Sequence, residues 1–197
     1  MPIRIRRASP DRVEHLAGIL GRALASEPMI SWPFRGRPDP EPVRATTLFR
    51  VLLEPYVDAG VVVEDGAGRG CAAWIPPDRL DVFEATDVVA RDAIRHATDD
   101  GGARYARLWD WIGDHMPDEP IWFLDMVGVD PAHQGRGVGT ALIRFGLARS
   151  TRTGVPALLE TGTPTNVPYY ERFGFRVVDE GDVPDGGPHV WFMRREP

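Results

Sequence analysis

Residues 127–140 read VGVDPAHQGRGVGT, and this stretch decides the fold. An apolar strand ending at Val129 leads through a glycine-rich turn into an amphipathic helix. Gly135, Gly137 and Gly139 let the backbone bend without a Cβ clash, so successive N–H groups at the helix start can face one anion, aided by the helix dipole. The stretch therefore predicts a phosphate-binding turn that fits a pyrophosphate.

Three other interpretations of this turn compete with that one. A P-loop requires a Gly-Lys-Ser/Thr ending, which the sequence lacks. A Rossmann turn places its glycines directly after the strand, whereas residues 130–134 intervene here, although Glu160 near the end of the next strand keeps that alternative open. Glycines that only turn the chain are the third alternative, since a lone glycine-rich turn is a weak signal.

Two linked motifs resemble those of the GNAT acetyltransferases. Gln134-x-x-Gly137-x-Gly139 matches the family's acetyl-CoA signature, and residues 166–175, NVPYYERFGF, look like the helix that packs beside the pantetheine arm. Within the family, residues 119–197 look most like the puromycin N-acetyltransferase group, and the first half resembles it more loosely. The resemblance implies direct transfer of an acetyl group from acetyl-CoA to an amine through a tetrahedral intermediate, with CoA as product.

The resemblance also implies which residues bind acetyl-CoA. The backbone near Met126 and Val127, on a strand that splays from its neighbour at 156–160, would receive the thioester carbonyl. Asn166 would bond the pantetheine amide, although asparagine is also favoured at helix starts. The expected set is Met126, Val127, Val129, Gln134, Gly135, Arg136, Gly137, Val138, Gly139, Thr140, Asn166 and Tyr170.

The reaction requires an unprotonated amine, a stabilised oxyanion and a proton for the departing thiolate. Tyr170 occupies the position of the family's catalytic tyrosine and is the expected general acid. A buried ring whose hydroxyl only satisfies a backbone group is the alternative for Tyr170.

The general base has several candidates. Period-two alternation predicts that Asp125 shares a strand face with Val127 and Val129, where its carboxylate can take the amine proton through a water. Glu160, in the family's Glu-Thr pair, is a second candidate that can instead orient the amine or bond to backbone. An ordered water and a purely structural Asp125 stay open.

Working outward, the hydrophobic periodicity predicts a single α/β domain over 1–197. Taken with the resemblance, this is a GNAT fold with a mixed, mostly antiparallel central sheet splayed in the middle and helices on both faces. Residues 1–116 form the acceptor-side half and 117–197 the acetyl-CoA-binding half. Strands are expected at 2–7, 61–64, 71–75, 121–129, 156–160, 175–179 and 189–194, and helices at 13–24, 43–56, within 79–116, at 137–152 and at 167–172.

The acceptor is expected to be the primary amine of a small molecule, an antibiotic or metabolite, with a puromycin-like compound as one candidate. The proline- and aromatic-rich loop 26–42 favours a closed pocket. The predicted substrate-binding residues are Trp32, Phe34, Trp74, Asp125 and Glu160, with core packing as the alternative for each ring. A protein or peptide N-acetyltransferase and a non-catalytic acyl-CoA sensor are the alternative functions.

The amino-acid composition limits the binding partners that are expected. Twenty-three basic against twenty-nine acidic residues give a net charge of -6, which disfavours nucleic acid. The one cysteine, Cys71, cannot form an internal disulfide, and the five histidines show no metal-ligand spacing. Without a ~20-residue apolar run or a signal sequence, we expect a soluble, cytoplasmic monomer or homodimer.

Overall fold

The computed structural model describes residues 3–37 and 41–197. Residue 2 of the expected first strand and residues 38–40 of the loop 26–42 lie outside this range.

Short 3₁₀ turns at Pro10–Arg12, Trp32–Phe34 and Pro131–His133 join the main elements. In chain order these are β1 (Ile5–Arg7), α1 (Val13–Leu24), α2 (Pro28–Ser31), α3 (Glu41–Asp58), β2 (Val62–Asp65), β3 (Gly70–Ile75), α4 (Leu80–Ala97), α5 (Ala103–Asp114), β4 (Trp122–Val129), α6 (Val138–Thr153), β5 (Ala157–Thr161), α7 (Asn166–Glu171), β6 (Arg176–Asp182) and β7 (His189–Arg195).

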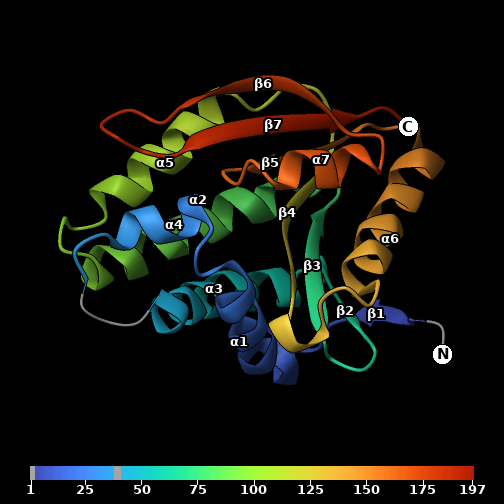
Figure 1. The fold of residues 1–197 in the computed structure, drawn as a ribbon, viewed down its shortest axis with the longest axis horizontal. Coiled ribbons are helices and arrows are strands. Elements are labelled where there is room, and N and C mark those ends of the chain that lie inside the picture. The colour runs from blue at the N-terminus through green and yellow to red at the C-terminus, as the bar shows by residue number, and fades with distance from the viewer. Residues whose placement is uncertain (1–2, 38–40) are drawn as a thin grey trace.

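Within the described residues the strands form one seven-stranded sheet in the order β1-β2-β3-β4-β5-β7-β6. Neighbouring strands are antiparallel except β4 and β5, which are parallel. Apolar stripes of α1, α3 and α4 pack on one face and α6 covers the other (Figure 1). The predicted α/β fold with helices on both faces of a mixed sheet is therefore confirmed.

The sheet opens in its middle. The ladder between β4 and β5 consists of two residue pairs, Trp122 with Ala157 and Phe123 with Leu158, after which the strands diverge. This is the predicted splay. The wedge between the two strands is where side chains from other elements reach the centre of the sheet.

A β-bulge lies on the other edge of β4. Ala73 of β3 pairs with Met126, but the next residue, Trp74, pairs with Leu124, which leaves Asp125 as the extra residue. The bulge interrupts the alternation of side chains along β4. Phe123 and Met126 both pack into the core under α1, α3 and α4, while Leu124 packs on the α6 side.

No helix in residues 3–37 and 41–197 is long and apolar enough to cross a membrane.

Candidate active site

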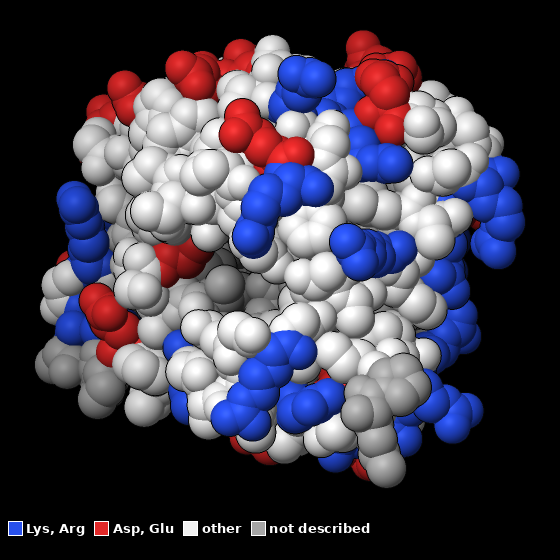
Figure 2. Space-filling view, turned by 45° about the vertical axis from the view of Figure 1, so that its right-hand side comes forward, with Lys and Arg blue, Asp and Glu red and all other residues white. Residues whose placement is uncertain are grey.

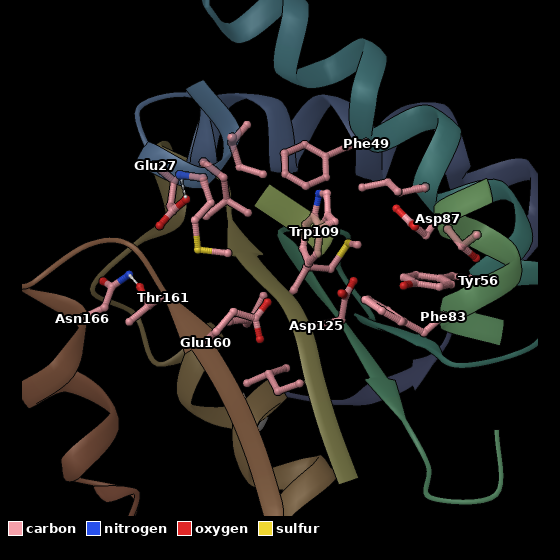
Figure 3. A pocket seen from close by; sticks show the side chains of 18 of the residues that line it. Glu27, Phe49, Tyr56, Phe83, Asp87, Trp109, Asp125, Glu160, Thr161 and Asn166 are labelled. Carbon is pink, nitrogen blue, oxygen red and sulfur yellow. Dashed lines mark hydrogen bonds between the residues drawn. The ribbon is translucent and has the colours of Figure 1, made fainter. Parts of the chain in front are cut away.

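A small cavity of about 90 Å³ lies in the wedge between β4 and β5. Its walls come from the segment after α1 and from α3, α4, α5, β4, β5 and α7, so residues far apart in the sequence meet there (Figure 3). Most of the lining is apolar or aromatic, and four carboxyl side chains reach it, Glu27, Asp87, Asp125 and Glu160. Within the described part of the chain, no group of three or more His, Cys, Asp or Glu residues is arranged to hold a metal ion.

Asp125 and Glu160 face each other across the wedge (Figure 3). Burial raises the pKa of Asp125 to about 7; the hydrogen bond from the Tyr56 hydroxyl lowers it, and the charge of Asp87 raises it. Burial and the charge of Asp125 hold the pKa of Glu160 well above its usual value. Both carboxyl groups therefore hold their protons more readily than exposed carboxyl groups do.

Glu27 fastens two parts of the molecule together. Its carboxylate accepts one hydrogen bond of 2.7 Å from the N–H of Met29, at the start of α2, and another of 2.7 Å from the N–H of Gly162, just after β5. Burial raises the pKa of Glu27, and these backbone donors oppose that shift. Glu27 therefore ties the acceptor-side segment to the end of β5.

A larger groove of about 660 Å³ adjoins this cavity. It runs along the end of β4, the glycine turn, the start of α6 and one side of α7. Figure 2 shows a hollow in this side of the molecule with both basic and acidic side chains around it. Cavity and groove share Leu24, Glu27, Val127, Asn166 and Tyr170, so the two spaces meet at the wedge.

The glycine turn has the backbone conformation that its sequence predicts. Gly135 and Gly137 have φ values of +72° and +82°, in the left-handed region that favours glycine, and Gly137 is the N-cap of α6. The amide of Gln134 donates to the Val129 carbonyl at 3.2 Å and braces the turn against β4. The first N–H groups of α6 need partners outside the helix, which suits an anion in the groove.

Most of the residues expected to bind the cofactor line this groove. These are Val127, Val129, Gln134, Gly135, Gly137, Val138, Gly139, Thr140, Asn166 and Tyr170. Met126 instead lines the smaller cavity, and Arg136 is an exposed side chain of the turn outside the groove wall. Asn166 is not the N-cap of α7, which is Thr165; its amide donates to the Thr161 hydroxyl at 3.0 Å.

Tyr170 is buried in the wall common to the cavity and the groove. Burial raises the pKa of its phenol, so the hydroxyl keeps its proton. Tyr169 beside it packs edge-on against Tyr170 and Phe173, with the Arg172 guanidinium 4.7 Å from its ring centre.

A comparison with models of protein families shows to which family this arrangement belongs. The acetyltransferase (GNAT) domain model matches residues 59–177, more than half of the chain. The chain belongs to the GNAT acetyltransferases. The glycine turn, α6, the wedge and α7 all fall inside the matched range.

Several acetyltransferases are similar to this one. An uncharacterized N-acetyltransferase of Schizosaccharomyces pombe is 27% identical over 66% of this chain and 56% of its own length. The mycothiol acetyltransferase of Propionibacterium freudenreichii is 31% identical over 63% of this chain and 36% of its own length. The chain thus spans about half or less of these curated relatives. A solved Corynebacterium glutamicum structure, described as histone acetyltransferase HPA2 and related acetyltransferase, shares the fold with a TM-score of 0.65 and 22% identity, covering 100% of this chain and 97% of that one.

Three aromatic residues expected at the acceptor site of this GNAT protein lie elsewhere. Trp74 projects from β3 towards α6, where its Nε1 donates to the Leu142 carbonyl at 3.2 Å, and a Cβ on Gly146 would lie 2.0 Å from its ring. Trp32 packs in a separate apolar cluster with α5 and β7, and Phe34 packs in the core under α1 and α3. All three are at most 4% exposed, and the expectation that they bind substrate is therefore corrected to core packing.

The expected orientation of Asp125 is also wrong. Val127 and Val129 pack on the α6 side, whereas Asp125 meets Tyr56 of α3 on the opposite face. The bulge at Asp125 is the reason, because one extra residue breaks the two-residue alternation. Asp125 nevertheless lies beside Glu160, as a shared role requires (Figure 3).

Sequence reasoning missed several lining residues of the cavity. Glu27, Phe49, Tyr56, Phe83, Asp87 and Tyr105 all reach it from α3, α4, α5 or the segment before α2. Each lies on or beside an amphipathic helix, where an apolar ring reads as ordinary core. Glu27 alone carried a signal, an acidic side chain directly before the proline that opens α2.

Proposed function

We propose that the protein transfers the acetyl group of acetyl-CoA to the primary amine of a small molecule. The observation that carries this proposal is the junction of two unlike spaces at Tyr170 and Val127. One is a groove made of a glycine turn and a helix start, and the other is a small cavity with two carboxyl groups at its base. A donor bound in the groove and an amine bound in the cavity meet at this junction.

The groove fits acetyl-CoA by its chemistry. Its left-handed glycines and the free N–H groups at the start of α6 suit the pyrophosphate, and the edge of β4 beyond Phe123 is available to the pantetheine arm. Gln134, Gly135, Arg136, Gly137, Val138, Gly139 and Thr140 would surround the pyrophosphate, and Met126, Val127, Val129 and Asn166 the arm. Acetyl-CoA supplies an acetyl group activated as a thioester.

The side chains at the junction divide the proton transfers between them. Asp125, next to a protonated Glu160, accepts the proton that the incoming ammonium must lose. Tyr170 holds a proton on its Oη for the departing thiolate, because burial keeps the phenol neutral. Backbone N–H groups of β4 near Met126 and Val127 would stabilise the oxyanion.

The size of the cavity favours a compact acceptor. Its volume of about 90 Å³ lies below the ~300–1,000 Å³ of pockets that hold drug-sized ligands. A peptide or a nucleoside-like antibiotic such as puromycin needs more room than this. The proposal therefore favours a small metabolite amine over those acceptors and over a sensor without catalysis, for which the Asp125, Glu160 and Tyr170 groups would have no use.

An acetyl-CoA-dependent thiol-release assay tests the proposal. The acceptor panel contains aryl- and alkylamines, polyamines, amino acids, aminoglycosides, puromycin and peptides. We expect release with one class of small amine and its loss in Tyr170→Phe. Calorimetric binding of acetyl-CoA without release on any acceptor would overturn the catalytic proposal in favour of a sensor.

A further inference from the structure

The four carboxyl groups of the cavity are not equally available to a ligand. The Glu27 carboxylate already accepts the N–H groups of Met29 and Gly162. Asp87 Oδ2 pairs with Arg91 at 2.5 Å, and Arg91 in turn donates to Asp110 at 2.9 Å, while Asp87 Oδ1 is buried and has no hydrogen-bond partner within the described residues. The protein itself therefore engages the Glu27 carboxylate and neutralises the charge of Asp87 through Arg91.

Asp125 and Glu160 remain for a ligand. The Tyr56 hydroxyl donates to Asp125, while Glu160 Oε2 is buried and has no hydrogen-bond partner within the described residues. A protonated Glu160 still has a carbonyl oxygen that accepts hydrogen bonds, and a buried acceptor without a donor is costly, so the pair calls for a donor supplied from the cavity. Because two carboxyl groups beside each other in a buried site resist being ionised together, the pair presents fewer than two negative charges, which suits one ammonium group.

The walls around this pair are apolar and aromatic. Phe49 and Trp109 lie on one side of Asp125, and Tyr56 and Phe83 on the other (Figure 3). No lysine or arginine from the described residues lines the cavity. Aromatic faces attract an ammonium group and pack against carbon, whereas nothing in the wall would balance a carboxylate or phosphate.

We propose that the acceptor is a compact monoamine cation with an apolar, preferably aromatic, body and no carboxylate or phosphate. The inference rests on the proposed acetyl transfer and narrows it to one substrate class. It assigns Phe49, Phe83 and Trp109 to the acceptor's body and Asp125 with Glu160 to its ammonium.

The proton balance is consistent with this assignment. The ammonium gives one proton to Asp125, and its freed lone pair forms the C–N bond to the acetyl carbon, giving a tetrahedral oxyanion whose collapse breaks the C–S bond. The nitrogen then loses a second proton, which replaces the one that Tyr170 Oη gives to the thiolate. The products are the N-acetyl amide, the CoA thiol and the proton on Asp125, which passes to solvent.

Three matched acceptors test the substrate class in the thiol-release assay. They are 2-phenylethylamine, phenylalanine, which adds a carboxylate, and 1,4-diaminobutane, which replaces the ring by a second cation. We expect kcat/KM for 2-phenylethylamine to exceed that for phenylalanine by at least about 100-fold, since like charges placed together in a buried site repel strongly. We expect an advantage of at least about tenfold over the diamine, because its second ammonium would lose hydration among apolar walls. Equal use of phenylalanine or of the diamine would overturn the inference.

A binding measurement tests the same idea without catalysis. The double variant Asp125→Asn/Glu160→Gln removes the charge and keeps the shape, and the protein is saturated with CoA. By calorimetry we expect the variant to bind 2-phenylethylamine at least about tenfold more weakly, the value of a charged hydrogen bond, and to bind the neutral 2-phenylethanol as before. Equal weakening of both ligands, or of neither, would contradict the inference. Asp110→Asn is the matched control, because it removes a carboxylate that pairs with Arg91 but does not line the cavity.

The two proposals fail in different ways. If acetyl transfer occurs but amino acids or diamines are preferred, the acceptor class is wrong and the acetyltransferase function stands. If no amine is acetylated and acetyl-CoA does not bind, the proposed function fails. The calorimetric comparison of amine with alcohol, made in that case without CoA, still decides whether the cavity recognises a cation.

Discussion

The groove and the cavity meet at Tyr170, but they are built from different parts of the chain. The groove is mostly backbone: two left-handed glycines, the first N–H groups of α6 and the open edge of β4, most of them within residues 127–140. The cavity is mostly side chains, brought together from at least six elements. A backbone site tolerates changes of side chain that leave its conformation intact, whereas a side-chain site changes its ligand with each substitution.

Tyr170→Phe should give the largest effect, because Tyr170 belongs to both spaces. Removing the Oη removes the proton donor for the thiolate, and we expect kcat to fall by about 10²–10⁴-fold while acetyl-CoA binding persists. Steady-state kinetics with calorimetry measures both quantities. Tyr169→Phe is the control, since Tyr169 packs on the ring of Tyr170, and an equal loss there would argue against a special role for Tyr170.

Replacing Gly137 should damage the groove and spare the cavity. Gly137 and Gly154 cap the two ends of α6 with φ values of +82° and +67°, so alanine at either position costs about 1–2 kcal/mol of left-handed strain. We expect Gly137→Ala to weaken acetyl-CoA binding at least about tenfold, as loss of charged hydrogen bonds does, and Gly154→Ala to leave it unchanged. Calorimetry and thermal unfolding of both variants provide the comparison. If the two variants bound acetyl-CoA with similar affinity, the proposal that the glycine turn binds the pyrophosphate would be wrong.

The pH profile should respond to the cavity alone. Asp125 must be ionised to accept a proton, so kcat/KM should rise with pH to a plateau above a midpoint near the pKa of about 7. Tyr56→Phe removes a hydrogen bond that lowers this pKa, so the midpoint should move up. Asp87→Asn removes a negative charge that raises it, so the midpoint should move down. If the midpoint moved in the same direction in both variants, the ionisation that sets the pH profile would not be that of Asp125.

Trp74→Phe should have the smallest effect on activity. The change removes the hydrogen bond from Nε1 to the Leu142 carbonyl and part of the packing against α6, at a cost of about 1–3 kcal/mol in the free energy of unfolding. Because Trp74 lies outside the cavity, KM for the acceptor should not change. Trp109→Phe, inside the cavity, should alter that KM. Denaturant unfolding and steady-state kinetics distinguish the two tryptophans, and a changed KM in Trp74→Phe would restore it to the acceptor site.

The features that could be predicted from the sequence belong to the groove more than to the cavity. The strand, turn and helix around Gly137, and Tyr170 in the short helix, come from contiguous residues whose spacing has a physical meaning. The order and type of the elements were also predictable, because the hydrophobic periods of α1, α6 and β4 are clear. The structure extends α3 to Glu41–Asp58 and β6 to Asp182, beyond the predicted ends.

The composition of the cavity could not be predicted in this way. Tyr56, Phe83 and Trp109 sit on helices whose apolar stripes serve the core along most of their length, and only tertiary packing decides which ring reaches the wedge. Trp32, Phe34 and Trp74 show the converse, since aromatic rings that the sequence marked for substrate fill the core. The bulge at Asp125 has no local signal either, because it appears only in the pairing with β3.

The carboxylate of Glu27 has a consequence for protein engineering. It holds N–H groups of Met29 and Gly162, which lie 133 positions apart in the sequence (162 − 29). A chimera that joins the first half of this chain to the second half of a relative will keep the shape of the wedge only if the relative offers a backbone N–H at the place of Gly162. Crossover points for swapping acceptor specificity should therefore be chosen so that residue 27 and the turn after β5 come from the same parent.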